Sequence, residues 1–165
     1  MLQGLPPMLS PHTRVLILGS FPSVRSLELQ QYYAHPQNQL WRLVFNALSV
    51  PSHGKCCASS YEIRSALLLK LGLGLWDVYA ACERSGSLDS AIQHAQPNDL
   101  ASLRTRCPQL QAIAHNGGES YKHAKHTLQL GLPVYKLPSS SPAHASWSFE
   151  RKLDVWKSVL QTHLK

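Results

Sequence analysis

Continuous apolar runs and apolar residues at helical spacing alternate along the chain. Runs rich in β-branched residues and leucine, typical of strands buried on both faces, occur at residues 14–20, 74–79, 110–116 and 132–138. Helical spacing predicts helices at residues 40–48, 61–71, 119–130 and 149–164, with a weaker helical stretch at residues 98–106. Because the strands alternate with helices, the pattern predicts an α/β fold with a parallel sheet covered on both sides.

Turn and cap residues mark the limits of several of these elements. Gly19 stops the first strand, and Pro51 marks the end of the first long helix. Residues 52–60 read as a surface loop, Ser60 is placed to cap the next helix, and Gly72 is placed to stop it. The sequence contains no repeat, linker or low-complexity segment, so residues 1–165 are interpreted as a single domain.

The composition is that of a globular protein with a basic balance. Hydrophobic residues make up 44% of the chain, and 16 Lys and Arg against 9 Asp and Glu give a formal net charge of +7. An excess of positive charge favours a polyanionic partner such as DNA or RNA, without bearing on the fold. Apolar runs fall short of the roughly 20 residues of a membrane span, and the N-terminus lacks a basic signal region. We therefore expect an intracellular, cytoplasmic protein with no membrane partner.

The four cysteines do not have the spacing of a metal site. Cys56 and Cys57 are adjacent, whereas Cys82 and Cys107 stand far from them and from each other. Zinc and iron–sulfur sites use spaced pairs such as C-x-x-C. We expect reduced thiols and no metal.

Polar segments follow all of the predicted strands. They are residues 20–38, 77–89, 116–118 and 139–146. In parallel α/β sheets, ligands bind beyond the carboxyl ends of the strands. We therefore expect these segments to converge on one face and to form a site there.

The segment YYAHPQNQLW at residues 32–41 is the most informative of these. Its rings and amide suit a loop that holds a planar ligand, with Tyr33 or Phe21 stacking on that ligand. Asn38 precedes a helix, where it is either a cap or the holder of a water molecule. An amide takes no proton at neutral pH, so Asn38 would orient a nucleophile rather than act as a general base.

Two further segments carry polar groups suited to DNA. Three successive hydroxyls, Ser139, Ser140 and Ser141, together with their backbone amides, suit a phosphate. Pro142, Ala143 and His144 could form a wedge that enters a duplex. Asn116, before a Gly pair, is placed to read a base edge or to contact phosphate. Each segment also has a purely structural alternative. The Ser-rich segment can be a loop that binds no ligand, and the Gly pair can simply allow a tight entry into the helix.

Common nucleotide and hydrolase motifs are missing. The sequence has neither G-x-x-x-x-G-K-[ST] nor G-x-G-x-x-G, which counts against an enzyme acting on a nucleotide triphosphate or a dinucleotide. It also lacks the G-x-S-x-G elbow that would support a Ser-His-Asp triad. No carboxylate pair is evident from the sequence.

In order along the chain, LILGSFPS, YYAHPQNQLW, LWDVYAACERSGSLDSAI, Asn116-Gly117 and LPSSSPAHAS resemble the uracil-DNA glycosylase superfamily, most closely its hypoxanthine-DNA (DNA-deoxyinosine) glycosylase branch. The resemblance covers roughly residues 14–160. It implies a single three-layer α/β/α domain with a central four-stranded, mainly parallel sheet. It also implies an enzyme that needs no cofactor and acts as a monomer on double-stranded DNA. Such an enzyme flips a deaminated base out of the duplex and hydrolyses the N-glycosidic bond that joins the base to its sugar.

The resemblance also implies roles for particular residues. Ser20-Phe21 stands where better-known branches carry Asp or Asn, and Ser139 stands where some carry a His. These departures count against efficient excision of uracil in general. The catalytic amide is then Asn38. The expected base pocket comprises Ser20, Phe21, Pro22, Ser23, Tyr33, His35 and Asn116. The expected DNA contacts are Ser139, Ser140, Ser141, Pro142, Ala143 and His144, with Arg84, Lys122, Lys125 and Lys136 as cations that attract phosphate.

Two other functions remain open from the sequence. One is a module that binds damaged DNA without cutting it, which would be favoured if Asn38 lay far from any pocket. The other is a hydrolase of free nucleosides or nucleotides, which would be favoured if residues 139–144 lay away from a basic groove.

Overall fold

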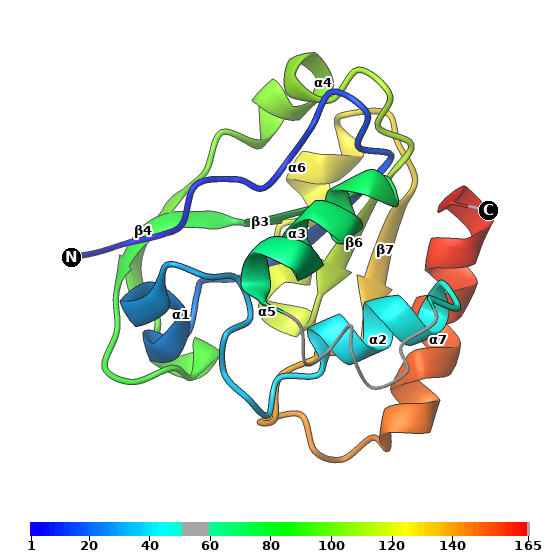
Figure 1. The fold of residues 1–165 in the computed structure, drawn as a ribbon. Coiled ribbons are helices and arrows are strands. Elements are labelled where there is room, and N and C mark those ends of the chain that lie inside the picture. The colour runs from blue at the N-terminus through cyan, green and yellow to red at the C-terminus, as the bar shows by residue number, and fades with distance from the viewer. Residues whose placement is uncertain (51–59, 165) are drawn as a thin grey trace.

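The architecture was obtained as a computed structural model that describes residues 1–50 and 60–164. A parallel sheet of four strands lies at the centre, in the order β3-β2-β6-β7 (Figure 1). Its strands are β2 (Val15–Gly19), β3 (Leu73–Asp77), β6 (Ala112–Asn116) and β7 (Val134–Leu137). All four coincide with predicted strands, and the predicted fold class is confirmed.

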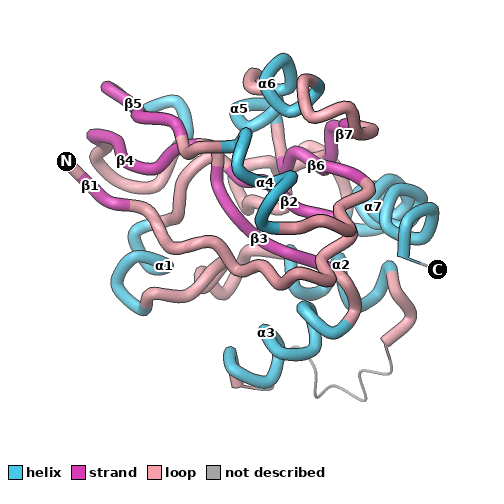
Figure 2. The backbone as a smooth tube through the Cα atoms, turned by 90° about the horizontal axis from the view of Figure 1, so that it is seen from above, coloured by secondary structure: helices cyan, strands magenta, loops and turns pink. Residues whose placement is uncertain are grey.

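Helices cover both faces of this sheet (Figures 1 and 2). One face packs against α2 (Leu40–Ala47), α3 (Tyr61–Lys70) and α7 (Phe149–Leu164). The other face is covered by η2 (Leu100–Ser102), α4 (Leu103–Arg106), α5 (Gly118–Tyr121) and α6 (Ala124–Leu128). The molecule is therefore a three-layer α/β/α sandwich.

Strand β2 shows why its sequence is apolar throughout. Val15 and Ile17 belong to the core beneath α2 and α7, while Leu16 and Leu18 belong to the core on the opposite face. All four side chains are completely buried. Successive side chains of a strand point to opposite faces, so a strand covered on both sides has no position left for a polar residue.

A second, antiparallel sheet was not predicted. Its strands, in the order β1-β4-β5, are β1 (Leu2–Gln3), β4 (Tyr79–Glu83) and β5 (Gln93–Pro97). The strand predicted at residues 74–79 ends at Asp77, and the prediction of a polar loop after it was wrong, because β4 begins at Tyr79. Tyr79 and Cys82 are buried in the core that also contains Leu16 and Leu18, so packing against residues distant in the sequence holds this segment in place.

Other elements differ in detail. The predicted helix over residues 119–130 is interrupted and forms α5 and α6, and the short helices α1 (Val24–Leu29) and η1 (Asp89–Ala91) were not predicted. The Ser60 hydroxyl caps α3 as expected, accepting a hydrogen bond from the Ile63 amide at 3.3 Å.

Some expectations concern residues outside the described part of the chain. Pro51, the surface loop at residues 52–59 and the Cys56-Cys57 pair lie there. Within residues 1–50 and 60–164, Cys82 and Cys107 are buried free thiols. In the same ranges, no helix is long and apolar enough to cross a membrane.

Candidate active site

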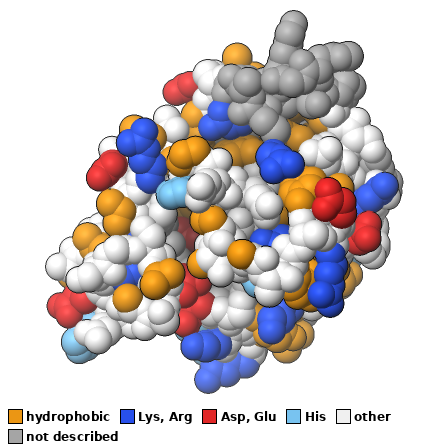
Figure 3. Space-filling model, turned by 90° about the horizontal axis from the view of Figure 1, so that it is seen from below, with side chains coloured by type: hydrophobic (Ala, Val, Ile, Leu, Met, Phe, Trp, Pro, Cys, Tyr) orange, Lys and Arg blue, Asp and Glu red, His pale blue; other side chains and the backbone are white. Residues whose placement is uncertain are grey.

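A pocket of about 390 Å³ opens beyond the carboxyl ends of the parallel strands. Figure 3 views the molecule from this side, where Lys and Arg side chains gather along part of the surface and acidic side chains show near its middle. The polar segments that follow β2, β3, β6 and β7 all contribute to the lining. They do so through Gly19, Ser20, Phe21, Pro22, Ser23, Ser26, Tyr32, Tyr33, His35, Asn38, Asp77, Ser87, Leu88, Asp89, Ser90, Asn116, Ser139, Ser140, Ser141, Ala143 and His144.

The structure brings nearly all of the predicted site residues together. Of the predicted pocket and loop residues, only Pro142 is outside the lining, and it is exposed on the loop; the predicted cations Arg84, Lys122, Lys125 and Lys136 also lie outside it. The expected convergence of the strand-end segments therefore occurs. The sequence left Asp89 open between a helix cap and a contact with the base, and it assigned no site role to the lining residues Gly19, Tyr32 and Asp77.

Tyr33 forms a wall of the pocket in an unusual backbone conformation. Its φ angle is 53°, in the left-handed region that residues other than glycine rarely adopt. Its hydroxyl accepts a hydrogen bond from Asn116 Nδ2 at 3.2 Å. Such strain costs on the order of 1–3 kcal/mol and persists only where surrounding contacts enforce it, often at functional sites.

Asn38 lies at the entry to α2 and lines the pocket. The N-cap position of α2 is Gln39, whose side chain makes no capping bond, but Asn38 Oδ1 accepts a hydrogen bond from the amide of Leu40, the first residue of the helix, at 3.0 Å. A carbonyl oxygen has a second lone pair, and the amide nitrogen has two further donors. This contact with the helix start therefore fixes the orientation of the Asn38 amide and leaves it able to bind a water molecule.

Asn116 is committed to holding the Ser-rich loop. Its Nδ2 donates to Ser140 Oγ at 2.9 Å as well as to Tyr33, and its Oδ1 accepts from the Ser140 amide at 3.0 Å. Both donors are used, so Asn116 has little left with which to read a base edge. The arrangement favours a clamp between β6 and the loop.

The Ser-rich loop is organised differently from the expected phosphate pincer. The Ser140 amide is bound to Asn116, and the Ser141 amide donates to Ser139 Oγ at 3.1 Å. The Ala143 and His144 amides both donate to Ser141, and Ser140 is completely buried. These amides are thus used within the loop or by Asn116, and contact with a phosphate falls to the partly exposed hydroxyls of Ser139 and Ser141 and to nearby cations.

Helix α7 supports this loop from behind. Trp156 is fully buried and donates from Nε1 to the Pro138 carbonyl at 2.9 Å. Lys152 is 2% exposed, and its Nζ donates to Gln39 Oε1 at 3.1 Å. Burial lowers the pKa of Lys152. The backbone amide of Gln39 in turn donates to the Ser140 carbonyl. Through Gln39, α7 therefore connects the segment that carries Asn38 to the Ser-rich loop.

Two carboxylates line the pocket, although the sequence had shown no such pair. Asp77 ends β3 and is 5% exposed, and its Oδ2 has no hydrogen-bond partner among the described residues. Burial, followed by the negative charge of Asp89, raises the pKa of Asp77 to about 7. Asp89 accepts a hydrogen bond from Ser20 Oγ, and burial raises its pKa as well. An acidic residue closing a fully apolar strand was the one signal for Asp77.

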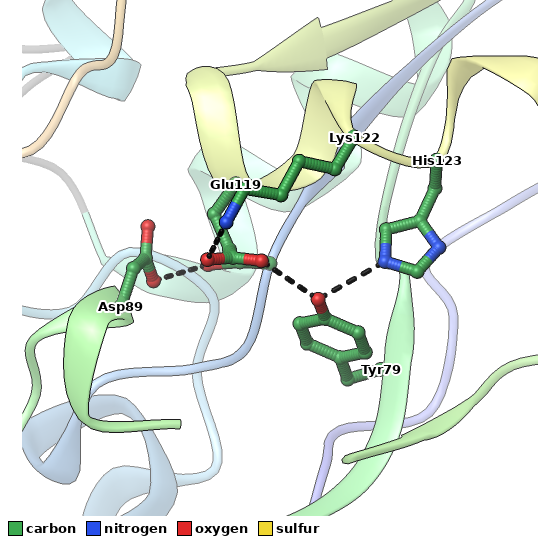
Figure 4. Close-up of polar contacts among 6 residues, drawn as sticks. Tyr79, Asp89, Glu119, Lys122 and His123 are labelled. Atoms are coloured by element: carbon green, nitrogen blue, oxygen red, sulfur yellow. Dashed lines mark hydrogen bonds and ion pairs between the residues drawn. The ribbon is translucent and has the colours of Figure 1, made fainter. Parts of the chain in front are cut away.

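Polar groups beside the pocket are paired with one another (Figure 4). Tyr79 Oη donates to Glu119 Oε2 at 2.8 Å and lies 3.0 Å from His123 Nε2. Lys122 Nζ donates to Glu119 Oε1 at 3.1 Å. Part of the positive charge that was expected to attract phosphate is therefore neutralised within the protein.

Arg84 is also engaged away from DNA. Its guanidinium donates to the carbonyls of Pro22 and Gly86 and lies 5.2 Å from the centre of the Phe21 ring. It supports the pocket wall from outside.

His115, next to Asn116 on β6, joins the sheet to its helices. It is completely buried, with Nδ1 2.8 Å from Ser120 Oγ and Nε2 2.8 Å from Thr127 Oγ1. Burial lowers the pKa of His115 to about 4, so the ring is neutral at pH 7. A neutral ring donates through one nitrogen and accepts through the other, so one of the two hydroxyls must donate to the ring instead of to its nearby backbone carbonyl, that of Leu18 for Ser120 or of Ala124 for Thr127.

Acidification should therefore destabilise the fold through His115. Between pH 6.5 and 4 the unfolded state binds a proton that the folded state does not, so stability falls as the pH falls. The loss is on the order of 3 kcal/mol. Denaturant unfolding at pH 7 and pH 4.5 should show this loss in the wild type and a smaller one in His115→Gln. The exposed His12→Gln serves as control, and equal losses in all three proteins would contradict the assignment.

Groups of three or more His, Cys, Asp or Glu side chains that would hold a metal ion do not occur among the described residues. The polar groups of the pocket lining are amide, hydroxyl, imidazole and carboxyl groups.

Comparison with known proteins identifies the family. Residues 6–161 match the model of the uracil DNA glycosylase superfamily. A hypoxanthine DNA glycosylase from Methanosarcina acetivorans is 36% identical over 159 residues, 96% of this chain and 98% of that protein. Another, from Methanosarcina barkeri, is 33% identical over 142 residues, 86% of this chain and 87% of that protein.

A solved structure agrees with this result. The solution NMR structure of a Methanosarcina acetivorans protein assigned to the uracil DNA glycosylases superposes with a TM-score of 0.86 at 36% identity. The match covers 97% of this chain and 96% of that one. The family model spans most of the chain, and sequence and fold agree over nearly its whole length. The chain belongs to the uracil DNA glycosylase superfamily.

Proposed function

We propose that this protein is a monofunctional DNA N-glycosylase that acts as a monomer on double-stranded DNA inside the cell. It flips a deaminated base out of the duplex, hydrolyses the N-glycosidic bond and leaves an abasic site. Hypoxanthine is the first expected substrate, with uracil and xanthine as further candidates. The observation that carries the proposal is one pocket that joins ring walls, the Asn38 amide and the Ser-rich loop.

The pocket suits a flipped base. A base inside a duplex is inaccessible, and extruding it costs a few kcal/mol, least for a mispaired base such as hypoxanthine or uracil. The lining combines the rings of Phe21, Tyr32 and Tyr33, which can pack against a planar ligand, with hydroxyl, amide and carboxyl groups that can bind its edge. A volume of about 390 Å³ lies in the range of sites for small organic molecules.

Exposed cations lie beside the mouth of the pocket. Arg151 stacks on the Trp147 ring at 3.7 Å, and Arg42 stacks on the Phe149 ring at 4.2 Å. Both rings follow the Ser-rich loop directly in sequence. Guanidinium groups held in this way suit phosphates that flank the flipped nucleotide. Together with the Ser139 and Ser141 hydroxyls, they give the loop a DNA-facing surface, with Ala143 and His144 in the wedge position.

The proposed reaction needs little acid–base chemistry at the sugar. Cleavage of the C–N bond gives the sugar an oxocarbenium character, as in other glycoside hydrolysis. Asn38 orients the attacking water, and its amide dipole stabilises positive charge on the sugar. The electron pair of the broken bond leaves with the base.

A strand-nicking assay tests the proposal directly. Duplexes carry deoxyinosine, uracil, xanthine or thymine opposite each normal base, and alkali converts abasic sites into strand breaks. We expect cleavage of the deoxyinosine duplexes, fastest where the base is mispaired. Binding without cleavage on all substrates would favour a damage-binding module. Release of hypoxanthine from free deoxyinosine, with no cleavage of DNA, would favour a nucleoside hydrolase.

A further inference from the structure

Asp77 is a buried carboxyl group in the pocket lining to which the proposed reaction assigns no role. It sits at the last position of β3, opposite Gly19 in the register of the parallel sheet. A side chain at Gly19 would place its Cβ 2.5 Å from Asp77 Oδ1 and 2.8 Å from Tyr33 Oη. The missing side chain at Gly19 therefore leaves these two oxygens open toward the pocket.

Among residues 1–50 and 60–164, no ion pair joins Asp77 to a cation. The charged groups that act on its carboxyl are Asp89, from η1, and Arg84, whose guanidinium is already bound to two carbonyls. Tyr32 and Tyr33 face it from the segment before α2, and His35 and His144 stand elsewhere in the lining. Burial and the like charge of Asp89 outweigh Arg84, and they raise the pKa of Asp77 to about 7.

A buried oxygen without a partner is costly, because a polar group removed from water needs a replacement for its hydrogen bonds. Asp77 Oδ2 is such an oxygen within the described part of the chain. Asp77 lines the pocket, so a ligand that enters it can supply the replacement when the carboxyl group turns to present Oδ2. The ligand group must then suit a carboxyl that carries a proton for part of the time at neutral pH.

We propose that Asp77 binds the flipped base as a neutral carboxylic acid, donating its O–H to a ring carbonyl and accepting the adjacent ring N–H. This inference rests on the proposed glycosylase function. Hypoxanthine presents this lactam edge through N1–H and O6, and uracil presents it through N3–H and O4. An ionised carboxylate still accepts the N–H but repels the carbonyl oxygen, so the proton decides whether both contacts form.

The same proton assists departure of the base. As the bond from the sugar carbon to the base nitrogen breaks, its electron pair stays on the base and spreads to the lactam oxygen. The O–H of Asp77 stabilises that charge, whereas an ionised Asp77 opposes it. Water adds its oxygen to the sugar carbon, and the water proton ends on the base. Asp77 keeps its own proton through the cycle.

Asp77→Asn separates this role from its alternatives. An amide has one donor and one acceptor in the same places as a neutral carboxylic acid, and it does not titrate. Single-turnover excision of hypoxanthine at saturating enzyme should fall about 10-fold per pH unit above pH 7 in the wild type. Asp77→Asn should keep activity at pH 6.5 and lose this alkaline decline. Asp77→Leu should be at least about 100-fold slower than Asp77→Asn at every pH.

Controls keep the result specific to Asp77. The exposed Asp154→Asn, on α7, should keep the wild-type profile, and DNA binding measured at each pH separates phosphate contacts from chemistry. Inactive Asp77→Asn, or an alkaline decline that persists in it, overturns the inference while the proposed function stands. A wild type that excises no base from any duplex overturns the proposed function and this inference together.

Discussion

Asn38→Ala should lower the rate of base excision by about 10²–10³-fold, with binding to the same duplex nearly unchanged. The pocket-lining amide is oriented by the hydrogen bond from the Leu40 amide to Asn38 Oδ1, and alanine removes both the water ligand and this hydrogen bond. Loss of the hydrogen bond costs about 1 kcal/mol of stability, which leaves the protein folded. Single-turnover kinetics on a deoxyinosine duplex and fluorescence anisotropy measure the two quantities separately.

The matched control is an asparagine on α2, the helix that follows Asn38. Asn46 is exposed, and its Nδ2 donates to the Arg42 carbonyl at 2.7 Å, away from the pocket lining. Asn46→Ala should excise at the wild-type rate. Asn38→Ser adds a second comparison, because serine can also accept a hydrogen bond from an amide at a helix start but is too short to hold the same water. Full activity in Asn38→Ala would remove Asn38 from the mechanism.

Asp89 is the competing candidate for activating water. It is a carboxylate in the pocket lining, and Ser20 Oγ donates a hydrogen bond to it. If Asp89 were the base that accepts the water proton, Asp89→Asn would lose as much activity as Asn38→Ala. We expect a smaller loss, because Asn38 fixes the position of the water whereas Asp89 contributes only electrostatics.

Much of the site follows from the sequence because its residues are local to strand ends. Apolar runs identified the four central strands, and the known geometry of parallel sheets then placed residues 20–38, 116–118 and 139–146 on one face. The sequence also placed Asn38 at the start of the helix, although the N-cap position proved to be Gln39, and Asn38 binds the first helical amide from one residue earlier. These inferences need only short-range patterns and one topological rule.

The rest depends on contacts between distant segments. Residues 79–83 read as a polar loop, yet they pair with β1 near the N-terminus and with β5. Asn116 appeared free to read a base until the loop brought Ser140 against it. The significance of Asp77 arises from burial beside Gly19 and Tyr33, which no local pattern reports.

Gly19→Ala should abolish excision while preserving the fold, because the new methyl group would enter the base pocket. Its Cβ would lie 2.5 Å from Asp77 Oδ1 and 2.8 Å from Tyr33 Oη, so both side chains must move. A displacement of about 1 Å is enough to cost on the order of 100-fold in rate. Overpacking of this kind destabilises a protein by roughly 1–3 kcal/mol. Single-turnover excision and denaturant unfolding measure the two effects.

Two comparisons show whether the methyl group acts at the base. Gly118→Ala is the matched control, since a Cβ there meets nothing within 4 Å and its activity should be unchanged. A duplex with an abasic site presents the same phosphates but puts no base into the pocket, so Gly19→Ala should bind it as tightly as the wild type does. Equal weakening on abasic and deoxyinosine duplexes would mean that the substitution disturbs the DNA-facing loop. Wild-type excision by Gly19→Ala would mean that the flipped base lies elsewhere, because a base seated over Gly19 and Asp77 leaves no space for the methyl group.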